Sequence, residues 1–148
     1  MKHASKPLKP IETTLLREIN FGIRENLPSG VTAEEAKDII AAKTGAPRDG
    51  IVDHAESADA VIVRQRDLFN LFKAQLSEIP DSRNRLIKVL CVSHGGFIKS
   101  IMNHHLSLEL TSLGNCSINV VEVLWNDNAD SSFDINAVRV HDTAHLDF

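Results

Sequence analysis

A histidine and a pair of glycines follow a short apolar run in the second half of the chain. Residues 87–92, Ile-Lys-Val-Leu-Cys-Val, lead into Ser93 and His94, and Gly95 and Gly96 come next. A run so short and so apolar is typical of a strand buried on both faces, as in a parallel sheet. The glycines then open a helical pattern, and the first turn of a helix offers free N–H groups and a partial positive charge. Because glycine lets a ligand approach the backbone and His94 adds a donor, this arrangement favours a phosphate group.

The same stretch also fits an ordinary strand-to-helix turn whose histidine bonds only to backbone, and the local residues leave both interpretations open. The serine-nucleophile motif Gly-x-Ser-x-Gly does not occur in the sequence. Neither Cys91 nor Cys116 is followed by an arginine at the spacing that a cysteine phosphatase needs. His141 and His145 lie four residues apart without a convincing third ligand, so we expect neither a metal site nor a cofactor.

Glu18 is the second candidate for chemistry. It lies among apolar residues in the stretch Leu-Leu-Arg-Glu-Ile-Asn-Phe-Gly, residues 15–22, which ends at a glycine. A carboxyl group in a partly apolar pocket has a raised pKa and can act as a general acid. The alternative is an exposed glutamate that forms a weak surface pair with Arg17.

Helices are expected on both sides of these candidates. Residues 29–45 predict a helix, because Thr32 and Glu35 form a capping box and Gly45 stands where a C-terminal cap belongs. Residues 57–78 carry apolar side chains at helical spacing and predict the longest helix.

Strands complete the expected fold. Residues 11–22 are consistent with a short strand that ends at a turn. Residues 118–125 and 133–142 predict two strands, and the turn-forming residues 126–132 between them predict a hairpin. The expected architecture is therefore α/β: a mostly parallel sheet flanked by helices, with a C-terminal hairpin.

Length and composition indicate one globular domain. The chain has 148 residues, a formal net charge of −4 and two cysteines, and residues 1–10 are expected to form a loose lead-in. An acidic chain without a basic patch does not suggest nucleic-acid binding, and no apolar run approaches the roughly 20 residues of a membrane span. Two cysteines without a disulfide pattern fit a reducing, cytoplasmic setting.

Four segments of the sequence occur in an order that resembles the histidine phosphatase superfamily, which includes the phosphoglycerate mutases. They are residues 15–26, 56–69, 89–102 and 138–146. The resemblance spans about residues 8–146 and is strongest to the small-phosphatase branch that contains the TIGAR-type fructose-2,6-bisphosphatases. It implies a partial phosphoglycerate-mutase-like fold and a small phosphorylated metabolite, such as a sugar bisphosphate, as substrate.

The resemblance also implies roles for individual residues. His94 matches the second histidine of the family's site, which stabilises the transferring phosphoryl group, and Gly95 would help to bind the phosphate. Glu18 matches the general acid of the family's Leu-x-Glu-x-x-x-Gly motif. Two positions depart from the pattern, since Ala55 and Asn26 stand where the family has glycines.

One element of the family pattern is missing from the sequence. The family's nucleophile is a histidine in an Arg-His-Gly motif, and these 148 residues contain no such motif. We therefore expect an N-terminally truncated domain with little or no phosphatase turnover of its own, and an exposed sheet edge that allows self-association. The alternatives are a pseudoenzyme that acts as a phosphate-binding or protein-interaction module, and an unrelated α/β domain.

Overall fold

The computed structural model describes residues 9–125 and 133–146. The described part contains three α-helices, two strands and several short 3-10 turns. The three helices come first along the chain and the two strands follow them. The elements are α1 (Ala33–Thr44), α2 (Ala58–Ser77), α3 (Gly95–Leu106), β1 (Ile118–Trp125) and β2 (Phe133–Asp142), with the 3-10 turns η1 (Thr14–Leu16) and η2 (Gly22–Arg24) near the start. Most of the expected loose lead-in, residues 1–8, and the expected hairpin turn, residues 126–132, lie outside the described residues.

Helix α1 is bounded by the two caps that the sequence predicts, Thr32 and Gly45, and so begins later than the predicted range 29–45. The hydroxyl of Thr32 accepts a hydrogen bond from the Glu35 N–H at 3.2 Å, and the Glu35 carboxylate accepts one from the Thr32 N–H at 2.8 Å. Gly45 closes the helix by donating its N–H to the carbonyl of Ala41. These bonds satisfy backbone groups that every helix end leaves free, which is why the local sequence was sufficient to predict the two caps.

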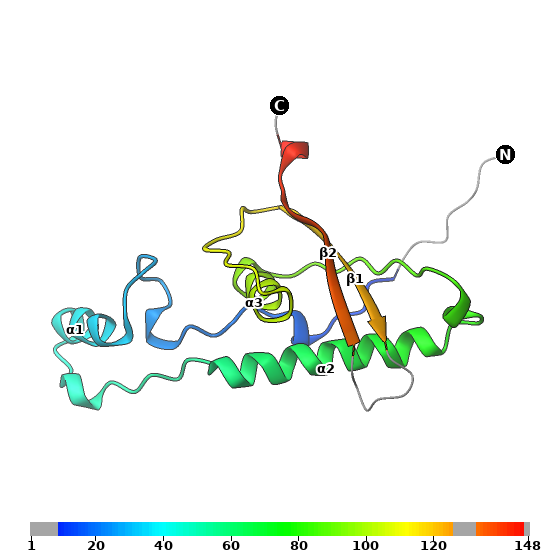
Figure 1. The fold of residues 1–148 in the computed structure, drawn as a ribbon. Helices are drawn as coiled ribbons and strands as arrows, with labels where there is room; N and C mark the ends of the chain where they lie inside the picture. The colour runs from blue at the N-terminus through cyan, green and yellow to red at the C-terminus, as the bar shows by residue number, and fades with distance from the viewer. Residues whose placement is uncertain (1–8, 126–132, 147–148) are drawn as a thin grey trace.

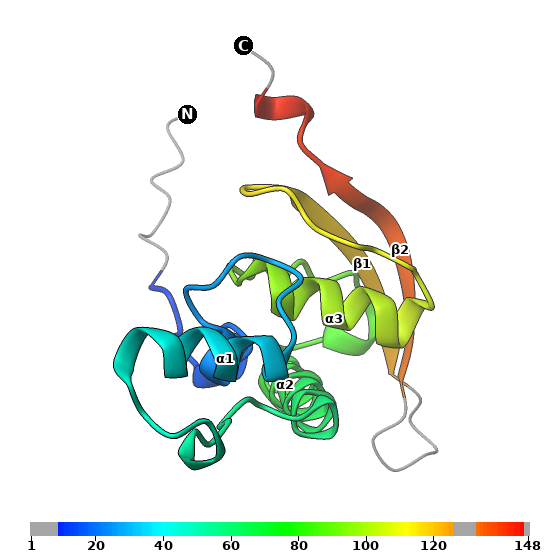
Figure 2. The ribbon, with the colours of Figure 1, turned by 90° about the vertical axis from the view of Figure 1, so that its left-hand side faces the viewer.

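The core forms where α2 meets α3. Val61 and Leu68 of α2 pack with Phe97 of α3, and all three are almost completely buried. Figure 1 shows α2 running along one side of the molecule with α3 above it, and Figure 2 shows the two helices crossing. Half-buried residues from η1 and its surroundings complete the core, so the segment that carries Glu18 is held against both helices.

The C-terminal hairpin is confirmed. Strands β1 and β2 pair antiparallel, with Val121 opposite Ala137 and Trp125 opposite Phe133. Alternate side chains of β1 face inward, as expected for a sheet covered on one side. The outward face is also apolar in part, since the side chain of Leu124 is 58% exposed. None of the helices in the described part of the chain is long and apolar enough to cross a membrane.

Two predicted strands are wrong. Residues 11–22 form the turns η1 and η2 rather than a strand, and residues 87–93 run without regular structure. Leu90 and Val92, expected to be buried, are 91% and 84% exposed. A strand needs a neighbour to pair with, and within residues 9–125 and 133–146 the only sheet is the β1–β2 hairpin. The mostly parallel sheet is therefore not found in the described part of the chain.

A matched pair of leucine substitutions tests this difference in burial. Leu68 is 2% exposed and Leu90 is 91% exposed. We expect Leu68→Ala to lower the free energy of unfolding by about 2–5 kcal/mol, because it removes buried methyl groups and leaves a cavity. We expect Leu90→Ala to change it by less than about 0.5 kcal/mol, as exposed positions usually do. Urea denaturation at two protein concentrations measures both, and a large loss for Leu90→Ala would show that the segment is covered in solution.

An aromatic cluster connects α3 to α2 and β2. The ring of His105 lies 5.6 Å from that of Phe69 and 5.4 Å from that of Phe133, measured between centroids. Its Nε2 atom is buried and has no hydrogen-bond partner among the described residues. Burial, and to a lesser extent the neighbouring His104, lowers the pKa of His105 below its ordinary value of 6.5.

This shift predicts a loss of stability in mild acid. The unfolded chain takes up a proton on His105 at a higher pH than the folded chain, so stability falls as pH drops below about 6.5. We expect the free energy of unfolding to fall between about pH 7.5 and about pH 5.5, and His105→Phe to remove part of that fall. Replacement of the exposed His54 by Gln is the control for the loss of a histidine outside this cluster. An unchanged slope in His105→Phe would contradict the assignment.

Candidate functional site

His94 is the N-cap residue of α3. Its backbone is extended and its carbonyl accepts the first bond of the helix, from the N–H of Ile98 at 3.0 Å. The ring makes no capping hydrogen bond to α3 within the described residues, and the residue is exposed. The imidazole is therefore available to a ligand, as the phosphate-binding interpretation requires.

Glu18 supplies the cap that His94 does not. Its carboxylate accepts hydrogen bonds from the N–H of Phe97 at 2.9 Å and from the N–H of Gly96 at 3.1 Å. The N–H of the adjacent Ile19 donates to the same carboxylate at 2.9 Å. Because the first N–H groups of a helix carry partial positive charge, a carboxylate is favoured there. The alternative of a weak surface pair with Arg17 is wrong, because the Arg17 side chain pairs with the Glu56 carboxylate and donates to Glu18 only at its backbone carbonyl, at 3.2 Å.

The two glycines have different structural roles. A Cβ atom at Gly96 would lie 2.7 Å from a carboxylate oxygen of Glu18 and 3.1 Å from the ring of Phe21. A Cβ atom at Gly95 would meet only the Leu113 carbonyl, at 3.9 Å. Gly96 is thus required for the close approach of Glu18, whereas Gly95 leaves room beside His94. The predicted phosphate contact of Gly95 stays a prediction.

His94, Glu18 and Gly95 line one hollow of about 420 Å³. The apolar segment that precedes His94 and the loop around residues 113–117 form the rest of its wall. The loop is fastened to β2, since the N–H of Gly114 donates to Nε2 of His141 at 2.8 Å. His141 is therefore occupied by a structural bond, and no group of three metal-ligating side chains occurs in the part of the chain that the structure describes.

Arg64 and Glu56 form a buried ion pair next to the segment that carries Glu18, and the sequence analysis did not predict it. The guanidinium donates to both oxygens of the Glu56 carboxylate, at 2.9 Å from Nε and 2.8 Å from its terminal nitrogen. Both side chains are 8% exposed. The hydrogen bonds from Arg64 hold the pKa of Glu56 below its ordinary value. The sequence did contain a signal, because Arg64 occupies the same helical face as Val61 and Leu68, where a charged residue needs a partner.

The two departures from the family pattern are both accommodated. Asn26 has a φ angle of 65°, so it adopts the left-handed backbone that glycine would otherwise supply, and asparagine tolerates this conformation better than most residues. Ala55 is not among the described residues with a positive φ angle, so a Cβ atom is tolerated there. The nearby Gly22 is the position that needs glycine, since a Cβ there would lie 2.5 Å from the Ala55 backbone nitrogen.

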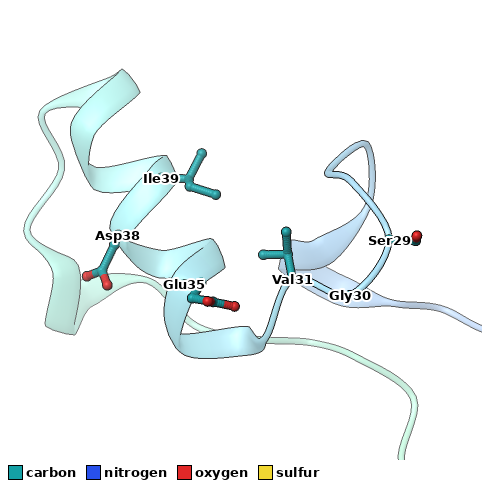
Figure 3. A pocket seen from close by; sticks show the side chains of 6 residues that line it. All are labelled: Ser29, Gly30, Val31, Glu35, Asp38 and Ile39. Atoms are coloured by element: carbon teal, nitrogen blue, oxygen red, sulfur yellow. The ribbon is translucent and has the colours of Figure 1, made fainter.

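A second hollow, of about 510 Å³, lies beside α1 (Figure 3). Its acidic side chains already have partners: Glu35 closes the capping box, and Asp38 accepts a 2.6 Å hydrogen bond from Arg48. It shares no residue with the hollow around His94, so we do not assign it to the same site.

A histidine at a helix N-terminus that shares a hollow with a carboxylate from a distant segment is suited to phosphate chemistry. The sequence profile of the histidine phosphatase superfamily (branch 1) matches residues 2–135. The match covers most of the chain, so the chain belongs to this superfamily, an α/β family, and the resemblance seen in the sequence is confirmed at that level. No curated protein and no solved structure matched the chain significantly.

The two glycines before Phe97 provide a matched test of the Glu18 contact. We expect Gly96→Ala to lower the free energy of unfolding by about 1–3 kcal/mol, because the new methyl group forces the carboxylate away from the helix. Gly95→Ala should be neutral or stabilising by up to about 1 kcal/mol, because alanine is the better helix former and has room. Thermal and urea denaturation of both variants measures the difference. Equal effects of the two changes would contradict the geometry.

Proposed function

We propose that this chain carries the phosphoryl-stabilising and proton-transferring half of a histidine phosphatase site that acts on a small phosphate ester. The observation that supports this most is that His94 and Glu18, distant in sequence, share one hollow at the start of α3. The membership of the superfamily adds to it, because its resemblance implies these roles for the same two residues.

The proposed roles divide between the two side chains. His94 donates a hydrogen bond to the phosphoryl group, assisted by the N–H of Gly95, and so stabilises the charge that develops on its oxygens. Glu18 gives a proton to the leaving oxygen as the P–O bond breaks, and takes one from water when the phosphohistidine is hydrolysed. One Glu18 oxygen accepts two N–H bonds and the other accepts one, so the second retains capacity for a proton.

The nucleophile is the part of the mechanism that these residues do not supply. No Arg-His-Gly occurs in the 148 residues, so no side chain matches the family's nucleophilic histidine. We propose that residues 1–148 alone have little or no turnover, and that a segment with the missing motif would have to complete the site.

We also propose a substrate class and a location. A hollow of about 420 Å³ is of a size that holds a small ester such as a sugar bisphosphate, and the motif pattern favours the TIGAR-type branch. Both cysteines are free, which is compatible with a reducing, cytoplasmic location.

A second candidate function is that of a pseudoenzyme that binds a partner or a second copy. The observation that favours it is the exposed apolar stripe before the site, in which Leu86 is 77% exposed and Leu90 is 91% exposed. Stripes of this kind mark interaction surfaces in many proteins.

An assay of hydrolysis and of anion binding tests the proposed function. With a generic phosphomonoester at mildly acidic to neutral pH, we expect wild-type protein to show turnover no greater than His94→Ala. Inorganic phosphate should nevertheless shift the NMR signals of His94 and Gly95, and His94→Ala should weaken this binding by about tenfold or more. Robust hydrolysis that His94→Ala abolishes would overturn the proposed inactivity, and phosphate binding that ignores His94 would overturn the proposed site.

A further inference from the structure

Three consecutive carbonyl groups just before Glu18 are bonded by side chains from other parts of the chain. The carbonyls of Leu15 and Arg17 accept hydrogen bonds from the same terminal nitrogen of Arg64, at 3.1 and 2.8 Å. The carbonyl of Leu16 accepts one from the Ser93 hydroxyl at 2.7 Å. The backbone that leads into Glu18 is thus held by these side chains as well as by the short 3-10 turn η1.

Arg64 also contacts Phe97, one of the residues whose N–H groups donate to the Glu18 carboxylate. Its guanidinium carbon lies 4.3 Å from the centroid of the Phe97 ring, and the Phe97 N–H is one of the donors to the Glu18 carboxylate. One side chain therefore holds both the segment that carries Glu18 and the helix turn that Glu18 caps. Stacking of a guanidinium on an aromatic face stabilises this arrangement further.

Almost all N–H donors of the Arg64 guanidinium form hydrogen bonds. Two donors engage Glu56 and two bonds go to the backbone carbonyls, while the residue is only 7% exposed. A lysine could keep the charge and pair with Glu56, but its single ammonium group cannot bond to a carboxylate and two carbonyls in the same plane. The site thus needs the shape of arginine as well as its charge.

We propose that Arg64 is the positioning residue for Glu18, holding its carboxylate over the first turn of α3 beside His94. Arg64 is not among the residues that line the hollow. The significance for chemistry rests on the proposed function, in which Glu18 transfers protons. The positioning itself is a property of the fold and can be measured without a substrate.

Hydrogen exchange of individual amides tests the proposal. In Arg64→Lys, we expect the amides of Gly96 and Phe97 to exchange about tenfold faster than in wild type, or more, because their acceptor is no longer held in place. The amides of α1 should be accelerated much less. The matched control is Arg66→Lys, an exposed arginine on the same helix, which should leave the exchange of Gly96 and Phe97 unchanged. Equal acceleration of all amides in Arg64→Lys would show only general destabilisation and would overturn the proposal.

A double-variant comparison separates positioning from general support. Glu18→Ala removes the acceptor, so Arg64→Lys added to Glu18→Ala should produce little further acceleration at Gly96 and Phe97. An undiminished effect of Arg64→Lys in that background would show that Arg64 acts by another route. If Arg64→Lys does not fold cooperatively, Glu56→Gln replaces it, because that change loosens the guanidinium while both carbonyl acceptors stay. Glu56 also accepts hydrogen bonds from the Arg17 side chain and the Asn20 N–H, so Arg17→Gln is the control for those contacts and should leave the exchange of Gly96 and Phe97 unchanged. Glu56→Gln should also accelerate hydrogen exchange at the Gly96 and Phe97 amides selectively. Uniform acceleration of all amides would again overturn the proposal.

The proposed function and the positioning role of Arg64 are tested by different measurements. Absence of phosphate binding at His94 with the exchange pattern as expected would refute the phosphatase site and leave Arg64 as the residue that positions a helix cap. Phosphate binding at His94 with no selective change at Gly96 and Phe97 in Arg64→Lys would refute the positioning role alone.

Discussion

The arrangement of the site depends on one buried ion pair, between Arg64 and Glu56. Taking two charges out of water is costly, and only good geometry with further hydrogen bonds offsets the cost. Both conditions are met here, since the carboxylate is bound through two nitrogens and the remaining donors reach backbone carbonyls. Removal of Glu56 would leave the buried charge of Arg64 without a carboxylate, whereas removal of Arg64 would leave Glu56 paired only with the more exposed Arg17. The pair thereby connects α2 to the segment of Glu18 and, through Phe97, to α3.

Glu18 joins stability and chemistry in one side chain. As a cap, it satisfies N–H groups of α3 that its own N-cap residue, His94, leaves free. As a residue of the hollow, it is the group proposed to move protons. The two uses need the same position, because the first turn of the helix is also where a phosphate would be stabilised. A change that moves Glu18 therefore affects the fold and the site together, which is why substrate-free measurements inform on the site.

The sequence predicted the elements whose signals are local. The capping box of Thr32 and Glu35, the helix predicted at residues 57–78, the helix that Gly95 and Gly96 open, and the antiparallel hairpin all depend on neighbours in sequence. The role of Arg64 could not be predicted in this way, because its carbonyl partners lie 47 and 49 residues away. The apolar pattern of residues 87–93 reports that these side chains can be buried in a strand. The residues of that segment cannot indicate whether a neighbouring strand exists. In the described part of the chain, no strand pairs with it.

The absence of a paired strand at residues 87–93 in the described part of the chain affects how firmly His94 is held. The segment that ends at His94 is fixed by side chains, through the Ser93 hydroxyl and the Glu18 cap, while Leu90 and Val92 just before it face solvent. A strand laid against this segment, from whichever chain, would pair its backbone groups and cover apolar surface. His94 would then stand at the end of a sheet strand instead of an unpaired one, with less freedom to move. Under the proposed function, this uncovered segment is where further order around His94 would have to come from.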